Sequence, residues 1–186
     1  MKKLITLLSA ALFTLSTHAV EIGGVKLPES LAVKEQSLAL NGAGVRSKFF
    51  MDIYAAGLYL TEASQEAKVI MAQDKPMALR LHITSGLLSA EKMETATREG
   101  FEKSTGGNTA PLQATIDAFI ETFKDGIVEN DVFDFVYAPE TGVNVFKNGE
   151  LKNNVKGLEF KKALFGIWVG EDAVSDDLKS GLLGSL

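Results

Sequence analysis

The sequence predicts an α+β fold in which helices lie on one face of a large antiparallel sheet. Three observations lead to this prediction. Short strand-like segments fill the first part of the chain, two helical segments follow over residues 89–126, and a strand meander with two further helices closes the chain. Strands and helices grouped in this way, instead of alternating one by one, are typical of an antiparallel sheet with segregated helices.

The first residues have the pattern of a secretory signal peptide. Lys2 and Lys3 form a short basic start, residues 4–15 are mainly apolar, and a small-x-small exit ends at Ala19. The apolar run is too short to span a bilayer, which needs about 20 residues. We therefore expect residues 1–19 to be a signal peptide that is cleaved after Ala19, and the protein to be exported, to a bacterial periplasm.

Residues 20–186 then form a single domain that is long enough to bury its own core. Loss of Lys2 and Lys3 with the leader changes the formal net charge from −5 to −7, and the chain has no cysteine. An acidic domain without clustered basic residues is a poor ligand for nucleic acid, so we expect no nucleic-acid partner and no transmembrane anchor. We interpret the basic group of Lys156, Lys161 and Lys162 as a solvated helix face.

The domain opens with strands. Three short apolar segments punctuated by glycine and proline come first, at residues 22–27, 31–33 and 38–40. Residues 45–60 are rich in apolar and aromatic side chains, and we expect them to run as one long strand. A short helix near residues 67–72 and an alternating strand over residues 78–84 follow.

Two helices come next. Ser89 is a good N-cap for the first, which carries Met93, Ala96, Gly100 and Phe101 on one stripe. Pro111 opens the second helix, and Gly126 can end it. The apolar face of this second helix consists of Leu112, Ile116, Phe119, Ile120 and Phe123.

The last third of the domain predicts a meander and two helices. Its three strands are expected at residues 132–137, 143–147 and 150–155. Asn148-Gly149, between the last two, is a strong signal for a two-residue hairpin turn. A helix over residues 160–168 and a shorter helix capped by Ser175 end the chain.

The sequence lacks the residue patterns of the common catalytic sites. His82 is the only histidine after Ala19, and it lies in an alternating strand. No cluster of Cys, His and carboxylates has the spacing of zinc ligands, and there is no G-x-S-x-G motif. Gly42, Gly44 and the pair Gly106-Gly107 fit neither a P-loop nor a dinucleotide fingerprint, so we interpret them as turns. We expect no metal and no cofactor.

The long segment 45–60 is more informative. Its period of two places Arg46, Lys48, Phe50, Tyr54 and Leu58 on one face, which changes from charged to aliphatic along its length. Such a face suits an amphipathic ligand whose acidic or phenolic head meets Arg46. The alternative is a half-exposed sheet face on which Arg46 pairs with a carboxylate. The opposite face is apolar enough for the core and consists of Phe49, Met51, Ile53, Ala55, Gly57 and Tyr59.

Three stretches resemble the chalcone isomerase family. Residues 41–60, NGAGVRSKFFMDIYAAGLYL, resemble its G-A-G-x-R … K-F … A-x-G-x-Y-L segment, and residues 164–183, LFGIWVGEDAVSDDLKSGLL, resemble its closing I-G-x-x-x-V-S-x-x-L-K stretch. Residues 84–106 lie where the family has a strand followed by a helix. The resemblance implies an open-faced β-sandwich, with a large antiparallel sheet, helices layered on one face and a ligand cleft between them.

The family contains isomerases, fatty-acid-binding members without turnover and exported bacterial members. In the isomerases, the arginine at the position of Arg46 holds the phenolate or enolate oxygen of the substrate. The tyrosine and asparagine that the isomerases carry at the start of the following helix correspond here to Ser89 and Ala96. Their hydroxyl and thioether pair corresponds to Ile167 and Trp168, so the arginine alone of this polar set is retained.

Tyr54 stands where the isomerases have a threonine, just before A-x-G-x-Y-L. Arg46 with Tyr54 looks like the pair with which the fatty-acid-binding branch grips a carboxylate. In a straight strand these two residues would be roughly 26 Å apart. They can share one head group only if the chain bends near Ser47-Lys48.

We therefore expect a periplasmic protein that binds a fatty acid or a similar amphipathic acid without turnover. The ligand-binding residues would be Arg46, Tyr54, Lys48, Phe50, Leu58, Ser89, Ile167 and Trp168. The alternative is an intramolecular lyase or isomerase that closes a ring by oxa-Michael addition, with Arg46 and Tyr54 as catalytic residues. A third possibility is an envelope scaffold with a vestigial cleft. The sequence leaves protein partners and oligomeric state open.

Overall fold

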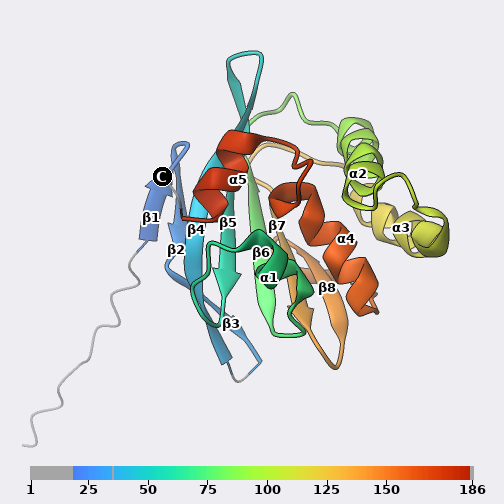
Figure 1. Ribbon diagram of the computed structural model, residues 1–186. Helices are drawn as coiled ribbons and strands as arrows, with labels where there is room; N and C mark the ends of the chain where they lie inside the picture. Colours follow the sequence, from blue (N-terminus) through green and yellow to red (C-terminus); the bar gives the residue numbers. More distant parts are fainter. Residues whose placement is uncertain (1–18, 35, 185–186) are drawn as a thin grey trace, which may run out of the picture.

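A seven-stranded antiparallel sheet dominates the computed structural model, which describes residues 19–34 and 36–184 (Figure 1). Each strand of this sheet pairs with its neighbour along the chain, in the order β3-β4-β5-β6-β7-β8-β9. The strands are β3 (Ser30–Val33), β4 (Gln36–Lys48), β5 (Met51–Leu60), β6 (Met77–Ile83), β7 (Val132–Ala138), β8 (Gly142–Lys147) and β9 (Glu150–Val155). The predicted leader lies outside the described residues except for Ala19.

The five α-helices of the described residues pack on one face of this sheet (Figure 1). They are α1 (Ala67–Ala72), α2 (Ala90–Ser104), α3 (Gln113–Ile120), α4 (Leu158–Val169) and α5 (Asp176–Leu182). Single 3₁₀ turns flank α3 at Ala110–Leu112, which contains the predicted Pro111, and at Glu121–Phe123. The predicted α+β class, with an antiparallel sheet and its helices on one face, is confirmed.

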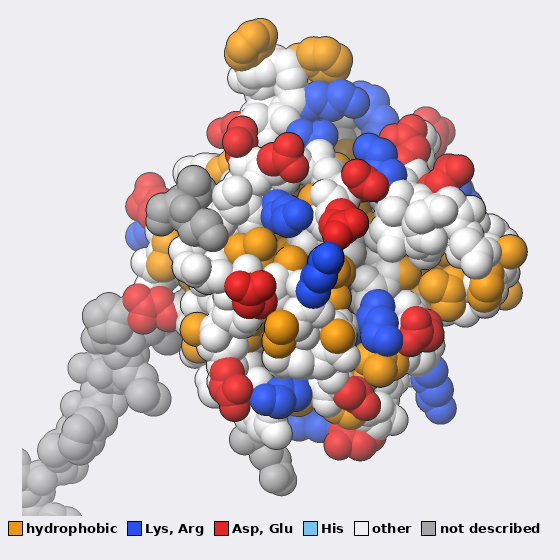
Figure 2. All heavy atoms as spheres, in the orientation of Figure 1, with side chains coloured by type: hydrophobic (Ala, Val, Ile, Leu, Met, Phe, Trp, Pro, Cys, Tyr) orange, Lys and Arg blue, Asp and Glu red, His pale blue; other side chains and the backbone are white. Residues whose placement is uncertain are grey.

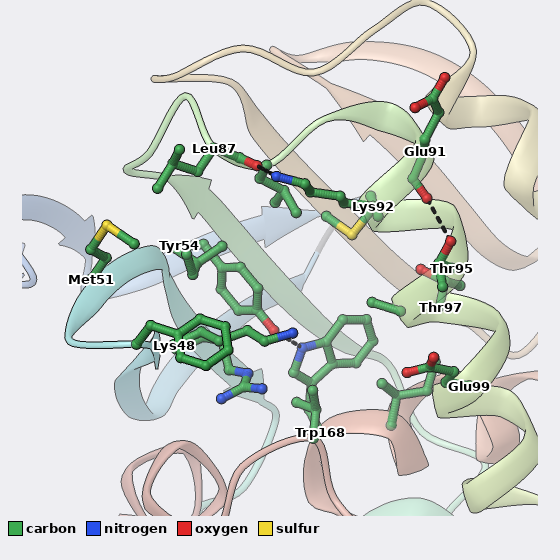
Figure 3. Close-up of a pocket in the computed structure, with 18 residues that line it drawn as sticks. Lys48, Met51, Tyr54, Leu87, Glu91, Lys92, Thr95, Thr97, Glu99 and Trp168 are labelled. Atoms are coloured by element: carbon green, nitrogen blue, oxygen red, sulfur yellow. Dashed lines mark hydrogen bonds between the residues drawn. The ribbon is translucent and has the colours of Figure 1, made fainter.

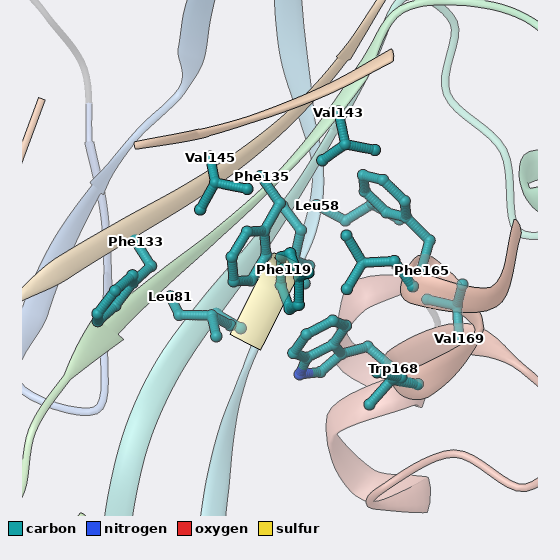
Figure 4. Close-up of a cluster of buried hydrophobic side chains, with 14 of the residues drawn as sticks. Leu58, Leu81, Phe119, Phe133, Phe135, Val143, Val145, Phe165, Trp168 and Val169 are labelled. Atoms are coloured by element: carbon teal, nitrogen blue, oxygen red, sulfur yellow. The ribbon is translucent and has the colours of Figure 1, made fainter. Parts of the chain in front are cut away.

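Aromatic side chains fill the layer between the sheet and the helices. Phe119 lies with its ring centroid 5.5 Å from that of Phe135, which in turn lies 5.7 Å from the ring of Trp168 (Figure 4). Phe101 and Phe160 complete this cluster, and both are buried. The apolar stripe predicted for residues 112–123 therefore faces the core.

The other face of the sheet is partly covered by a hairpin of β1 (Ala19–Ile22) and β2 (Val25–Pro28). Its turn is Gly23-Gly24, where both φ angles are positive, at 56° and 76°. Leu27 is fully buried, and a smaller cluster around Tyr59 lies on this side. The prediction of one strand over residues 22–27 is therefore wrong. This segment contains the end of β1, the turn and most of β2.

Residues 45–60 do not form the single strand that the sequence predicted. Phe49 and Phe50 form a two-residue turn between β4 and β5, with φ angles of 52° and 63°. Turns of this kind favour Asn-Gly because both central residues need a positive φ, so two phenylalanines gave no turn signal. The turn ends the period-two pattern, and Phe49 and Met51, which we expected in the core, are 78% and 44% exposed.

Gly42 and Gly44 are not turn residues, contrary to the prediction. Both lie within β4, where helix α5 crosses the strand backbone closely. A Cβ atom at Gly44 would lie 2.9 Å from the side chain of Leu178, and one at Gly181 would lie 2.5 Å from the carbonyl oxygen of Ala43. The glycines therefore allow a strand and a helix to pack backbone to backbone. Gly106-Gly107 do form a turn, after α2.

Lys161 is not on a solvated helix face, as its grouping with Lys156 and Lys162 had suggested. Its side chain projects from α4 and is completely buried. The ammonium donates hydrogen bonds to three carbonyl oxygens at the end of α1, those of Ile70, Met71 and Gln73, each at 2.8 Å. Lys161 thus closes a helix C-terminus that would otherwise leave these carbonyls unpaired.

Candidate functional site

A cavity of about 590 Å³ lies between the β4–β5 hairpin, helix α2 and the end of helix α4 (Figure 3). This volume is within the range of small-molecule sites, roughly 300–1,000 Å³. The hairpin contributes Arg46 and Tyr54, α2 contributes Met93 and its neighbours, and α4 contributes Trp168. Segments from both ends of the chain therefore build one site.

Arg46 and Tyr54 lie side by side in this site. They are direct cross-strand partners in the β4–β5 register, because the turn at Phe49-Phe50 folds the chain back between them. Side chains of such partners point to the same face of the sheet, with Cβ atoms about 4.5–5.5 Å apart. The distance of roughly 26 Å between Arg46 and Tyr54 that a straight strand would give does not apply. The chain bends between the two residues, as their pairing requires.

Tyr54 presents a free hydroxyl proton. The indole Nε1 of Trp168 donates to its hydroxyl oxygen at 3.0 Å, which fixes both rings (Figure 3). Tyr54 is only 6% exposed, and no described residue accepts the proton of its own hydroxyl. Burial raises the pKa of Tyr54 to about 12, although the hydrogen bond from Trp168 and the charge of Arg46 act in the opposite direction. The phenol is therefore a donor at neutral pH.

Arg46 has unused donors as well. Its Nη1 donates to the carbonyl oxygen of Ser47 at 2.8 Å, and the side chain forms no ion pair with any described carboxylate. Asp52, the nearest acid along the hairpin, accepts a hydrogen bond from the Ser47 hydroxyl at 2.7 Å. A guanidinium has five N–H donors, so most of those of Arg46 remain available to an anion. Within the described chain, the alternative of a structural ion pair is not seen.

The rest of the cavity wall is largely apolar. Ile53, Leu88, Met93, Ile167 and Val174 line it and contribute no charged groups. Charged and polar residues of α2, among them Glu91, Lys92, Thr95 and Glu99, lie along its outer side. The cavity thus joins two hydrogen-bond donors to an apolar space, which is the pattern of a site for an amphipathic molecule.

Five of the eight predicted ligand-binding residues line the cavity, namely Arg46, Lys48, Tyr54, Ile167 and Trp168. The other three do not. Phe50 points into solvent from the turn, and Leu58 is fully buried in the core between the sheet and the helices. The hydroxyl of Ser89 accepts a hydrogen bond from the amide of Lys92 and so caps helix α2.

The sequence interpretation missed the contribution of α2. It placed Met93, Ala96, Gly100 and Phe101 on one stripe of the helix but named none of them as a ligand-binding residue, although Met93 belongs both to the buried core and to the cavity wall. Met93 and Ala96 line the cavity, whereas Gly100 packs against Ile167 and Phe101 is buried among aromatic rings. An apolar helix stripe has the same pattern whether it faces a core or a cavity, so the sequence carried no signal that would separate the two.

Metal ligands are not grouped in the described residues, where no three His, Asp or Glu side chains come together in a way that could hold an ion. Within the same residues, no helix is long and apolar enough to cross a membrane. His82 lies on β6 with its Nε2 buried and without a hydrogen-bond partner.

Comparisons with known proteins agree with this architecture. Residues 19–184 match the sequence profile of a family described as chalcone isomerase-like. No curated protein sequence matches the chain. Among solved structures, a fatty-acid-binding protein of Arabidopsis thaliana is similar over 89% of this chain and 96% of its own length, with a TM-score of 0.69 and 19% sequence identity. At this identity the similarity shows the fold, which is the one that the resemblance implied. The chain belongs to the chalcone isomerase-like family.

Proposed function

We propose that this protein binds a fatty acid or a similar amphipathic acid in the cavity, without turnover. The observation that carries the proposal is the pairing of Arg46 and Tyr54 across the β4–β5 hairpin, with unused donors on both side chains. The carboxylate of the ligand would accept hydrogen bonds from the guanidinium and from the phenol. Bonds of this kind to a charged group are among the strongest that proteins make.

The apolar wall of the cavity supports the same ligand class. An acyl chain that leaves the head group would lie against Ile53, Met93 and Ile167. The Arabidopsis protein of the same fold is itself a fatty-acid-binding protein, which adds weight to this choice of ligand.

Binding without turnover is favoured by what surrounds the two donors. The positions at which the isomerases place a tyrosine and an asparagine hold Ser89, which is engaged as a helix cap, and Ala96, which has no polar group. With its pKa raised to about 12, Tyr54 stays protonated at neutral pH and is not available there as a general base. The two donors at the head of the site therefore support binding of an anion and not abstraction of a proton.

Trp168 provides a direct test, because it is the only tryptophan of the chain and it lines the cavity. Fatty acids brominated along the chain should quench its fluorescence with saturation, and native mass spectrometry should show one acid per protein. An alkanol of the same length, which lacks the carboxylate, should bind at least tenfold more weakly. A cavity that takes no acid of any chain length would refute the proposal.

Ring closure is a second candidate, since the same two donors would stabilise a developing enolate oxygen. A 2′-hydroxychalcone should then cyclise faster with the wild type than with Arg46→Ala, after subtraction of the uncatalysed rate. Equal rates for the two proteins would leave binding as the function of the site.

Export to a bacterial periplasm is part of the proposal and rests on the leader pattern of residues 1–19. Mature protein from a periplasmic extract should begin at Val20. Cleavage there would remove from β1 only its first residue, Ala19. Recovery of intact Met1 would refute the export.

A further inference from the structure

The tip of the β4–β5 hairpin exposes aromatic side chains that the fold does not use. Phe49 is 78% exposed and Phe50 is completely exposed, and no other aromatic side chain of the described residues is exposed. The hairpin projects beyond the body of the molecule (Figure 1), and hydrophobic side chains cap its far end with basic side chains just below them (Figure 2). Isolated exposed apolar residues are ordinary, but two adjacent phenylalanines on a projecting tip are not.

Backbone geometry makes phenylalanine a poor choice for this turn. Both residues have a positive φ, at 52° and 63°, which L side chains other than Asn and Asp rarely adopt. Asn-Gly would form the same turn with less strain. The backbone of this turn therefore gives no reason for an aromatic pair, and neither does the core, since both rings are exposed.

The surroundings of the tip extend its apolar surface and add positive charge. Met51 and Leu87, 44% and 47% exposed, line the mouth of the cavity beside the hairpin. Lys48 holds its ammonium 5.6 Å from the ring centroid of Phe49, and Lys92 reaches the carbonyl oxygen of Leu87. These basic groups stand out in a chain whose formal net charge is −5.

Acidic groups near the tip do not cancel this pattern. Asp52 keeps its negative charge while it accepts a hydrogen bond from the Ser47 hydroxyl, but the cations Arg46, Lys48 and Lys92 outnumber it on this side of the cavity. Figure 3 shows Lys48, Met51 and Leu87 on one side of the cavity and Glu91 and Glu99 on the other. The side of the mouth that adjoins the aromatic tip is therefore the basic one.

We propose that this tip inserts into the surface of a lipid bilayer and thereby sets the cavity mouth against the membrane. Aromatic residues flanked by lysine are typical of protein segments that lie at a membrane interface. A protein partner fits less well, because a stable interface buries about 800 Å² on each side and two phenylalanines supply about 150–250 Å² each. The docking itself does not depend on the ligand. Uptake of an acyl chain from the bilayer into the cavity rests on the proposed function.

Vesicle binding without any added ligand tests the docking. Wild-type protein should co-sediment with vesicles of phosphatidylethanolamine and phosphatidylglycerol, and more weakly with phosphatidylcholine alone. Phe50→Gly should lower vesicle affinity about tenfold, since it removes one inserted ring. Because glycine suits the positive φ of this position, thermal stability should hold or rise. Leu151→Ser, which removes an exposed leucine elsewhere on the sheet, should leave vesicle binding unchanged.

Three outcomes would overturn the docking. The first is unchanged vesicle binding by Phe50→Gly, and the second is no vesicle binding by the wild type. The third is a wild type that does not bind vesicles but self-associates in sedimentation velocity, with Phe50→Gly abolishing the self-association, which would make the tip a contact between copies. Quenching of Trp168 by brominated acids in vesicle-free solution should be the same for wild type and Phe50→Gly, since Phe50 does not line the cavity. Absence of quenching would therefore contradict the proposed function. Absence of vesicle binding would contradict the docking.

Discussion

Two cations of this molecule, Lys161 and Arg46, lack a carboxylate partner within the described residues, but their surroundings differ. Lys161 is completely buried and uses all three of its N–H donors on carbonyl oxygens of the chain. Arg46 is half-buried and lines the cavity, and its only hydrogen bond within the described residues goes from Nη1 to the carbonyl oxygen of Ser47. A cation without an ion pair therefore indicates a ligand only when the backbone has not already satisfied its donors.

Removal of Lys161 should have the largest effect on stability. Lys161→Met leaves three carbonyls without their donor, and the free energy of unfolding in urea should fall by about 3 kcal/mol or more. The control is Lys162→Met at the adjacent residue, whose ammonium pairs with Glu159 on the surface and should matter little. If both variants are equally stable, the network at the end of α1 is not structural.

Removal of the Arg46 charge should act on affinity instead. Arg46→Gln should weaken the binding of a brominated fatty acid by about 1.5–3 kcal/mol, the worth of a charge-assisted hydrogen bond, with unfolding in urea unchanged. Arg46→Lys should recover part of the loss, because an ammonium cannot reproduce the planar fork. Arg98→Gln is the control, since Arg98 pairs with Glu94 and Asp117 outside the cavity. A loss of stability without a loss of affinity would make Arg46 a structural residue like Lys161.

A smaller effect is expected at Tyr54. Tyr54→Phe removes one donor to the head group and should weaken fatty-acid binding by about 1 kcal/mol. It also leaves the indole N–H of Trp168 without its acceptor, so the tryptophan emission of the free protein should shift. Tyr59→Phe is the matched control, because its hydroxyl donates to the carbonyl of Pro28 on the other face of the sheet. If the two variants bind the acid equally, Tyr54 does not contact the ligand.

The smallest predicted effect is a pH dependence of stability at Lys161. Burial lowers the pKa of Lys161 to about 8, although the charge of Asp74 acts in the opposite direction. Above pH 8 the unfolded chain therefore holds a proton that the folded chain has released, and the contribution of this group to stability rises with pH. Between pH 8 and 9, wild type should gain about 1 kcal/mol relative to Lys161→Met. A gap that narrows as the pH rises would contradict the sign.

Most helices and strands could be predicted because their cap and turn residues are typical of one local structure only. Ser89 and Ser175 cap their helices, and Asn148-Gly149 turns between β8 and β9. The site was harder, since its geometry depends on the turn at Phe49-Phe50, whose residues favour strands. Without this turn, Arg46 and Tyr54 could not be brought together.

Lys161 shows a second limit of the sequence. Its neighbours Lys156 and Lys162 are surface residues, and nothing in the local pattern distinguishes the one that is buried. Its partners are carbonyls of a helix some 90 residues earlier in the chain, at sequence separations of 88 to 91. Backbone carbonyls exist at every position, so no sequence motif can identify those that will meet a lysine.

The close contact between β4 and α5 explains why this family has a signature in two distant pieces. Two segments pack against each other at this contact, the G-A-G stretch at residues 42–44 and the helix that carries Leu178 and Gly181. Neither backbone tolerates an added Cβ where the two cross. Because these residues touch where the strand and the helix cross, their sizes are not independent. Across homologues, a larger residue at position 44 should therefore occur only with a smaller one at position 178, and the two motifs should be lost or retained together.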